Sequence, residues 1–385
     1  MSRGKTYDFA VIGAGVFGAW TAWWLRKSGA SVLLLDAYGP ANARASSAGE
    51  SRIIRMGYGP DEIYTRWSMR SLPLWKDLFA RAGRPELFQP TGVLWIAQEH
   101  DSYALASAAA LQHVGVPFEK LSLPDLRRRY PQFAFDEDSW AILEAGSGVL
   151  MARRAVHAIV EQAQKLGVDY RHEAVRAPAA PGRVMELQTA GGQPIAAGAF
   201  VFACGAWLGK IFPALLATRI FASRQEIFFF GVPPGDPRFA PPAMPTWLFL
   251  RDEFYGMPDI ENRGFKIAND RHGPPADPDA QSRIASPEAA QLARDFLGRR
   301  FPALKNAPIV ETRVCQYENT SSGDFLIDRH PHHENVWLVG GGSGHGFKHG
   351  PALGEYVAAR LLQGVPGEER FSLATKNTIQ NRAIH

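Results

Sequence analysis

Residues 9–36 constrain the fold of this chain more than any other stretch. Apolar runs at 9–12 and 31–35 predict two short buried strands, and residues 20–27 between them predict a helix. A glycine-rich turn of the pattern G-x-G-x-x-G joins the first strand to this helix, and an acidic residue follows the second strand. This order of elements predicts a Rossmann-type dinucleotide-binding unit at the start of the chain.

The turn supplies five candidate cofactor-binding residues, namely Gly13, Gly15, Val16, Phe17 and Gly18. The first glycine makes the turn, the second lets the backbone approach a pyrophosphate, and the third lets the helix pack on the strand. N–H groups at the start of the helix favour phosphate oxygens. Asp36, about 20 residues further on, is placed to bind ribose hydroxyls. An acid there argues against a 2′-phosphate but does not separate NAD from FAD.

The composition indicates a globular protein of about two domains. Of its 385 residues, 46% are hydrophobic and 21% are charged. A net charge of +4, from 42 basic and 38 acidic residues, gives no reason to expect a nucleic-acid partner. No run approaches the about 18 apolar residues of a membrane span, and the first apolar run begins too early for a signal peptide. We therefore expect no nucleic-acid or membrane partner. The two cysteines do not make a disulfide framework, so a reducing cytoplasm is the expected location, and no metal site is expected.

Three later segments supply further candidate cofactor residues. The polar loop 39–51 contains Arg44, Ser46 and Ser47, and a connection of this length is typical of a binding loop. It leads into Arg52 and Arg55, which would share one face of a helical turn because they are three residues apart. A strand predicted at 168–175 ends at Val175, and another at 200–203 turns at Gly205, where small residues suit close approach to a cofactor.

The remaining pattern predicts an α/β fold in which a Rossmann-type domain is interrupted by a substrate domain. Helices are expected at 61–82 (interrupted by Pro73), 101–114, 123–126, about 151–166 (capped by Gly167), 286–298 (ended by Gly298) and 351–362 (ended by Gly364). Aromatic-rich segments at 220–232 and 245–267 predict antiparallel strands, and further strands are expected at 92–97, 312–317 and 336–339. The cofactor domain is assigned to 1–85, 148–215 and 315–385, and the substrate domain to 86–147 and 216–314.

A second glycine-rich turn, residues 340–346, favours a flavin over NAD as the cofactor. NAD-binding domains need one phosphate loop, whereas a second turn and helix could stabilise negative charge on a reduced flavin. Together with Cys315, this pattern resembles the sarcosine oxidase family of flavoenzymes, which includes N-methyltryptophan oxidases and fructosyl-amine oxidases. The resemblance covers nearly the whole chain. It is most specific at residues 51–55, 254–256 with Lys266, Cys315 with 324–328, and 344–348.

The resemblance implies that FAD is the cofactor and that Cys315 carries it covalently through the flavin 8α-methyl group. Arg52 matches an arginine packed against the flavin ring. The second turn adds five candidate cofactor-binding residues, namely Gly342, Gly344, His345, Gly346 and Lys348. Cys204 has no counterpart and is taken as structural.

The resemblance also implies roles at the site of reaction. Lys266 matches a lysine that promotes reaction with O2, because a fixed cation stabilises superoxide as it forms. Arg55 and Lys348 match the pair that holds the substrate carboxylate, where arginine gives a bidentate fork and lysine a point charge. Tyr255 and Tyr317 match tyrosines that line the substrate cavity.

Asp270 departs from the sarcosine oxidases, which carry a histidine four residues after the lysine, whereas fructosyl-amine oxidases carry an acid there. If the strand continues through Asp270, its side chain lies on the same face as Lys266. If the strand breaks at Asn269, Asp270 instead caps the following turn. His272 would be out of register in a regular strand. The cavity role predicts that sarcosine is a poor substrate.

The resemblance implies an FAD-dependent oxidase of a secondary amine, an N-substituted amino acid, working as a monomer. The amine passes a hydride equivalent to the flavin, the imine hydrolyses, and O2 is reduced to H2O2. A fructosyl-amine oxidase is one alternative, and a flavin amine dehydrogenase with another electron acceptor is a second, disfavoured by Lys266. The second glycine turn disfavours an NAD-linked dehydrogenase. The set of Arg55, Lys266 and Lys348 disfavours a non-enzymatic flavin sensor.

Overall fold

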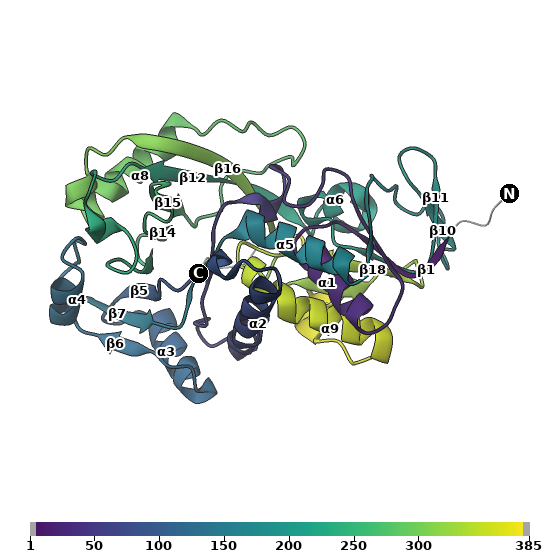
Figure 1. Cartoon of the computed structure of the whole chain (residues 1–385), viewed down its shortest axis with the longest axis horizontal. Coiled ribbons are helices and arrows are strands. Elements are labelled where there is room, and N and C mark those ends of the chain that lie inside the picture. Colours follow the sequence, from purple (N-terminus) through teal and green to yellow (C-terminus); the bar gives the residue numbers. More distant parts are fainter. Residues whose placement is uncertain (1–4, 380–385) are drawn as a thin grey trace.

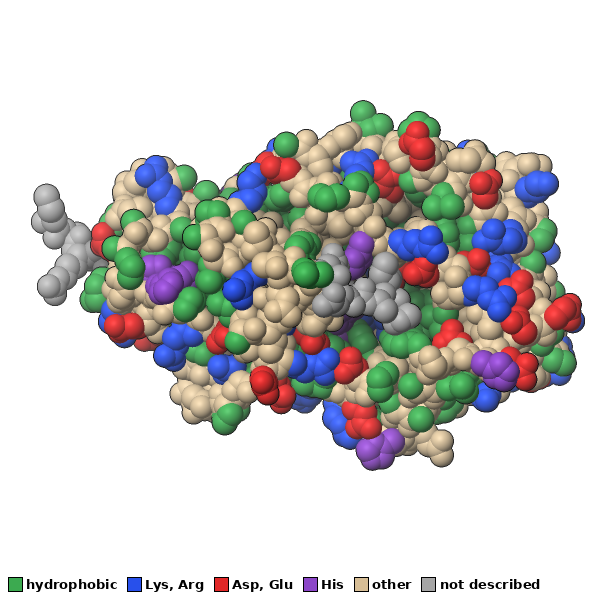
Figure 2. Space-filling model, turned by 180° about the vertical axis from the view of Figure 1, so that it is seen from behind, with side chains coloured by type: hydrophobic (Ala, Val, Ile, Leu, Met, Phe, Trp, Pro, Cys, Tyr) green, Lys and Arg blue, Asp and Glu red, His purple; other side chains and the backbone are tan. Residues whose placement is uncertain are grey.

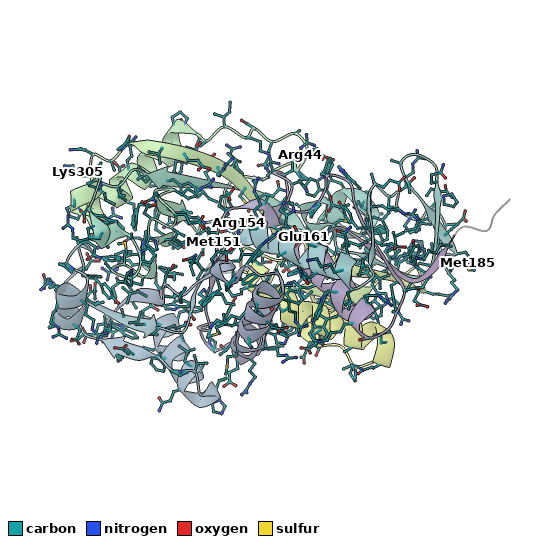
Figure 3. All side chains as sticks on the ribbon, viewed as in Figure 1. Arg44, Met151, Arg154, Glu161, Met185 and Lys305 are labelled. Atoms are coloured by element: carbon teal, nitrogen blue, oxygen red, sulfur yellow. The ribbon has the colours of Figure 1, made fainter. Side chains whose placement is uncertain are left out.

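The computed structural model describes residues 5–379, which form two halves lying side by side (Figure 1). One half carries helices α1 (Val16–Lys27), α5 (Ala152–Lys165) and α9 (Gly350–Gln363) around a largely parallel sheet. The other half is built on an antiparallel sheet. Met185 and Lys305, labelled in Figure 3, mark the two ends of the molecule.

The first half is organised around a seven-stranded sheet in the order β17-β18-β11-β1-β2-β9, with β10 paired to β11. Its strands are β1 (Thr6–Ile12), β2 (Val32–Asp36), β9 (Asp169–His172), β10 (Glu186–Gln188), β11 (Pro194–Phe202), β17 (Leu326–Arg329) and β18 (Val336–Gly340). The pairs among β18, β11, β1, β2 and β9 are parallel, whereas β17 and β10 pair antiparallel. The carboxyl ends of the central strands therefore meet at one edge, where such sheets bind ligands.

Helices α1 and α9 pack unusually close together on this sheet. A Cβ added to Gly354 would lie 2.6 Å from the carbonyl carbon of Trp20, and one on Gly350 would lie 2.5 Å from Val16. Two glycines of α9 thus let its backbone approach α1. This contact places the second glycine turn, which precedes α9, beside the first.

The second half contains an eight-stranded sheet in the order β16-β12-β15-β14-β13-β5-β7-β6, in which only the β13–β5 pair is parallel. Its strands are β5 (Val93–Gln98), β6 (Glu119–Leu121), β7 (Ser139–Glu144), β12 (Phe221–Phe230), β13 (Thr246–Phe249), β14 (Phe254–Met257), β15 (Phe265–Asn269) and β16 (Ile309–Asn319). Helix α8 (Pro287–Arg300) covers one face, where its Phe296 stacks on Trp247 and Phe254. Helices α3 (Ser102–Val114) and α4 (Leu123–Arg129) complete this half.

A small sheet and one long helix complete the fold next to the parallel sheet. Strands β3 (Arg52–Ile54), β8 (Gly148–Leu150) and β4 (Phe88–Gln89) form the small sheet in the order β3-β8-β4. Helix α2 (Glu62–Arg81) contacts α9. Helices α6 (Leu208–Ile211) and α7 (Pro213–Leu216) are short. The division of the chain into domains at the residues given above stays a prediction, and β16 runs across its 314/315 boundary.

The α/β fold with parallel and antiparallel sheets is confirmed, but four local predictions were wrong. Pro73 does not interrupt α2, and Gly298 lies inside α8, which ends before Pro302. The strand expected at 168–175 is limited to β9. Arg52 begins the extended strand β3 and Arg55 follows it, so the two do not share a helical turn.

The surface carries both signs of charge. On the face shown in Figure 2, lysine and arginine side chains are interspersed with aspartate and glutamate. Within residues 5–379, no helix has both the length and the apolar character needed to cross a bilayer.

Candidate active site

A cavity of about 290 Å³, here called the cofactor cavity, opens at the carboxyl edge of the parallel sheet. Thirteen of the candidate cofactor-binding residues line it: Gly13, Gly15, Val16, Phe17, Asp36, Ser46, Ser47, Arg52, Val175, Gly205, Gly342, Gly344 and Gly346. These residues come from segments far apart in the sequence, and the sheet brings them together. The polar loop 39–51 thus lies where a binding loop was expected.

The first glycine turn has the geometry that a dinucleotide requires. Gly13 has a φ of +108°, and a Cβ there would lie 2.3 Å from the carbonyl oxygen of Ala203. A Cβ on Gly18 would lie 1.8 Å from the carbonyl oxygen of Gly13, so only glycine lets α1 pack on this turn. Gly15 is the N-cap of α1 and provides no side-chain cap. The Val16 N–H donates to Ser47 Oγ at 3.3 Å, and the N-terminal end of α1 as a whole favours phosphate oxygens.

The other polar groups of the cavity also fit FAD. Asp36 accepts the backbone N–H of Ala14 at 2.7 Å and that of Tyr38 at 2.9 Å, so it also shapes the turn. Ser46 Oγ is buried on the cavity wall and has no hydrogen-bond partner within residues 5–379. A cofactor with phosphate and ribityl oxygens would satisfy such a group.

Five candidate cofactor residues do not line this cavity. Gly18 packs beneath the turn, and the Arg44 carbonyl accepts a hydrogen bond from Gln316 at 2.8 Å. His345 and Lys348 line a second, adjacent cavity. Cys315 is buried beside the cofactor cavity, with its Sγ 3.5 Å from Nη2 of Arg52.

The second cavity, here called the substrate cavity, has a volume of about 60 Å³ and shares walls with the first. Five residues line both cavities: Arg52, Tyr317, Ser343, Gly344 and Phe347. Five of the six candidate catalytic residues line the substrate cavity: Arg55, Tyr255, Asp270, Tyr317 and Lys348. A ligand in the substrate cavity would therefore sit against the cofactor.

Two buried cations of the substrate cavity, Arg55 and Lys348, both contact Tyr58. The sequence analysis did not identify Tyr58 as a site residue. The Arg55 guanidinium lies 4.5 Å from the Tyr58 ring centroid and 4.4 Å from that of Trp95. Lys348 Nζ donates to Tyr58 Oη at 2.6 Å and to the His345 carbonyl at 2.9 Å. Cation–π contact and hydrogen bonding thus hold both cations in place. Their charges favour an anionic ligand group.

An acidic group is also part of the substrate cavity. Strand β15 ends at Asn269, whose side chain accepts the Arg271 N–H at 2.7 Å and so takes the capping role. Asp270 still lines the cavity, where its Oδ1 accepts from Tyr317 Oη at 3.0 Å. Burial raises the pKa of Tyr255 to about 12, with a further contribution from Asp270, so this tyrosine stays protonated. His272 lines the cavity as well.

Lys266, the sixth candidate catalytic residue, is enclosed behind the cavity wall. Its Nζ donates to the carbonyl and the hydroxyl of Ser51, both at 3.1 Å. Burial, together with the charge of Arg52, lowers the pKa of Lys266 to about 7. The protonated and neutral amine are therefore both accessible near neutral pH.

Glu144 was also missed by the sequence analysis, because nothing in its local sequence marks it. This buried carboxylate accepts four hydrogen bonds, from the N–H groups of Met56 (2.7 Å) and Gly57 (2.9 Å), Trp95 Nε1 (2.9 Å) and Ser147 Oγ (2.6 Å). It thereby fixes both the backbone after Arg55 and the indole on which Arg55 stacks. Across residues 5–379, no cluster of three or more His, Cys, Asp or Glu side chains is placed to hold a metal ion.

Comparisons with known proteins identify the family. Residues 8–360 match the family model described as FAD dependent oxidoreductase (DAO). The chain is 30% identical over 365 residues to the monomeric sarcosine oxidase of Streptomyces avermitilis, covering 93% of this chain and 94% of that protein. It is 28% identical over 382 residues to the N-methyl-L-tryptophan oxidase of Yersinia pestis, covering 96% and 99%.

A solved structure shows the same fold. Fructosamine oxidase (Amadoriase II) from Aspergillus fumigatus superposes with a TM-score of 0.79 at 22% identity, covering 98% of this chain and 93% of that one. The family match spans both glycine turns and most of both sheets. The chain therefore belongs to the DAO family of FAD-dependent oxidoreductases.

Proposed function

We propose that this protein is an FAD-dependent oxidase that converts an N-substituted amino acid to an imine and reduces O2 to H2O2. The observation that carries the proposal is the charge arrangement of the substrate cavity, with Arg55 and Lys348 as cations and Asp270 as the acid. The relatives named as sarcosine and N-methyl-L-tryptophan oxidases support this substrate class. When bound, FAD supplies the electron acceptor for the amine and the electron donor for O2.

The two cations orient the substrate. Arg55 makes cation–π contacts with two aromatic rings and Lys348 is hydrogen-bonded to Tyr58, so both cations are held in place before a carboxylate arrives. A preorganised charge of this kind binds more strongly than a mobile surface cation. With the carboxylate fixed there, the amine is directed toward the wall shared with the cofactor cavity.

Asp270 and the two tyrosines are proposed to hold the other end of the substrate. Tyr317 donates to Asp270, and a hydrogen bond also links the hydroxyls of Tyr255 and Tyr317. The carboxylate keeps acceptor capacity for a substrate N–H or hydroxyl group. This feature favours N-substituents larger than methyl and makes a fructosyl-amine the second candidate substrate.

Lys266 and Cys315 are proposed to act on the cofactor. Lys266 provides a cation near Arg52, where superoxide formed from O2 would be stabilised. Cys315 is proposed to carry the flavin covalently, and its Sγ lies beside Arg52, which lines both cavities. Both cysteines are free thiols, which suits the proposed cytoplasmic location.

A flavin-bleaching screen tests the proposed function. The purified yellow protein is mixed without oxygen with N-methyl and larger N-alkyl amino acids, fructosyl-amino acids, and the matching amines that lack a carboxylate. We expect the N-substituted amino acids, but not the amines without a carboxylate, to bleach the flavin. Air should then restore the colour, with one H2O2 formed per turnover. Bleaching without peroxide would instead indicate a dehydrogenase, and no bleaching by any amino acid derivative would refute the proposal.

A further inference from the structure

Glu318 is a buried acid of the cofactor cavity to which neither the proposed reaction nor the family resemblance assigns a role. It lies near the end of β16, one residue after Tyr317, and only 6% of it is exposed. Its Oε1 accepts the backbone N–H of Gly342 at 3.0 Å. Its Oε2 is buried and has no hydrogen-bond partner in the described chain, residues 5–379. An unpartnered buried oxygen of this kind requires an explanation.

The unpartnered oxygen lies on the wall of the cofactor cavity. Glu318 lines that cavity together with Gly205 and Gly342, and a Cβ built on Gly205 would lie 3.1 Å from Oε2. The carboxyl group thus stands between the turn after β11 and the second glycine turn. The Cys204 thiol interacts with both Glu318 and Asp36, and Tyr317 and Ser343, which lie next to Glu318 and Gly342 in the chain, line both cavities. The carboxyl group of Glu318 therefore lies between the Asp36 end of the cofactor cavity and the wall shared with the substrate cavity.

The surroundings of Glu318 disfavour a charged carboxylate. Opposite it on β12 stands Ala222, and the thiol of Cys204, from the turn after β11, interacts with it. Burial raises the pKa of Glu318 to about 7, although N–H groups of Gly342 and Gly341 act in the opposite direction. Within residues 5–379 no basic side chain contributes to this pKa. Burial also raises the pKa of Cys204, which therefore stays neutral.

We propose that Glu318 binds FAD as a neutral carboxylic acid, with its Oε2–H group donating a hydrogen bond to a ribityl or diphosphate oxygen of the cofactor. An ionised glutamate would offer no donor there and would repel the diphosphate. Binding of FAD is therefore coupled to protonation of Glu318. The inference rests on the proposed use of FAD but not on the identity of the amine.

The coupling has a defined direction. Below pH 7 the carboxyl group of the empty protein is already protonated, and FAD binds without proton uptake. Above pH 7 each molecule of FAD must bind together with one proton, so the dissociation constant rises about tenfold per pH unit. A variant with an amide at this position keeps an N–H donor and cannot ionise, so its affinity should not follow this pH dependence.

Reversible FAD binding tests the proposal. Full-length protein carrying Cys315→Ser is prepared without flavin, and the quenching of FAD fluorescence is titrated from pH 6 to pH 9. We expect affinity to fall about 50-fold between pH 7 and pH 9 with Glu318, and to stay flat with Glu318→Gln. Glu173→Gln, which alters another acid on the wall of the same cavity, serves as the matched control and should keep the pH dependence.

Proton uptake gives a second measurement that needs no change at Glu318. Calorimetric titration with FAD at pH 8.5, in two buffers of different ionisation enthalpy, should report close to one proton taken up per FAD. Uptake of no proton, or equal pH dependence with Glu318 and Glu318→Gln, would overturn the proposal. Failure to bind FAD even at pH 6 would instead count against FAD as the cofactor.

Discussion

Tyr317 Oη donates a hydrogen bond of 3.0 Å to Asp270 Oδ1, and this pair joins the antiparallel sheet to the wall shared by the two cavities. Asp270 lies one residue past the end of β15, and Tyr317 lies on β16, two strands away in the sheet order. The acid four residues after Lys266 is thus oriented by a tyrosine that also borders the cofactor cavity.

Asp270→Asn should lower kcat/KM for the best substrate at least tenfold, because the amide cannot supply the charge that we propose for binding the N-substituent. The melting temperature should change little, since Asn269 already caps the turn. Steady-state kinetics and thermal unfolding measure the two effects. Asn269→Ala is the matched control. It should lower the melting temperature but change kcat/KM little. A variant of Asp270 that melts several degrees lower but keeps its rate would show a purely structural role.

Substitution of Cys315 and substitution of Cys204 should have opposite effects on the retention of flavin by the denatured protein. Acid-denatured protein should keep its yellow colour in the pellet, and Cys315→Ser should release all flavin to the supernatant. Cys204→Ser is the control and should retain the flavin, because the Cys204 thiol donates to the Ile12 carbonyl at 3.3 Å and burial raises its pKa. Release of flavin from the unmodified protein would refute covalent attachment.

Lys266→Met should slow reoxidation by O2 by orders of magnitude, while anaerobic reduction by substrate changes little. Because the pKa of Lys266 is lowered to about 7, its Nζ is charged below pH 7 and becomes neutral as the pH rises through that value. Reoxidation should therefore slow above pH 7 in the unmodified protein and show no such step in the variant. Stopped-flow measurement of both half-reactions tests this, with Lys305→Met, at the far end of the molecule in Figure 3, as control.

Replacing Arg55 or Lys348 by Met should weaken binding of a carboxylate substrate by about 1.5–3 kcal/mol, the range for a hydrogen bond to a charged group. The loss should appear mainly in substrate affinity, measured by anaerobic titration of the flavin spectrum. A decarboxylated analogue should bind the unmodified protein and the variants about equally. Equal sensitivity of the acid and its analogue would contradict the carboxylate role.

Glu144→Gln should destabilise the protein and raise KM for carboxylate substrates. An amide oxygen cannot accept all four hydrogen bonds that Glu144 receives, and each buried donor left unsatisfied costs about 1–3 kcal/mol. The backbone after Arg55 would then be less well fixed. Urea unfolding and kinetics measure the two effects. Glu137→Gln removes an exposed acid from the same half of the molecule and should change neither.

Sequence reasoning found the residues that local patterns mark. The glycine turn, Asp36 and the aromatic strands follow from periodicity and from turn chemistry, and the resemblance supplied Arg55, Lys266 and Lys348. Tyr58, Glu144 and Glu318 were missed because their partners come from distant parts of the chain. Glu144, for example, is 88 residues from Met56, whose N–H it accepts. Such a carboxylate cannot be distinguished from a surface acid until the fold brings the donors to it.

The same reason explains the errors at Gly298 and Pro73. A glycine near the end of a helical pattern predicts a cap, but Gly298 continues α8, and Pro302 follows the helix. Pro73 lies in α2, where tertiary packing holds the helix together despite the missing N–H. Asp270 shows another limit of sequence reasoning, because the two alternatives, a position in the cavity and a break of the strand at Asn269, did not exclude each other. The strand breaks at Asn269, yet the acid still faces the cavity.

Strand β16 carries Cys315, Tyr317 and Glu318 within four residues, so one continuous piece of backbone positions the proposed flavin link, a wall of the substrate cavity and the proposed proton-coupled contact. This has a consequence for recombination between family members. Chimaeras with crossovers in the loops on either side of residues 309–319 inherit the three groups as a unit. A crossover inside the strand would combine a cysteine from one parent with a tyrosine and an acid from the other. This combination of side chains occurs in neither parent.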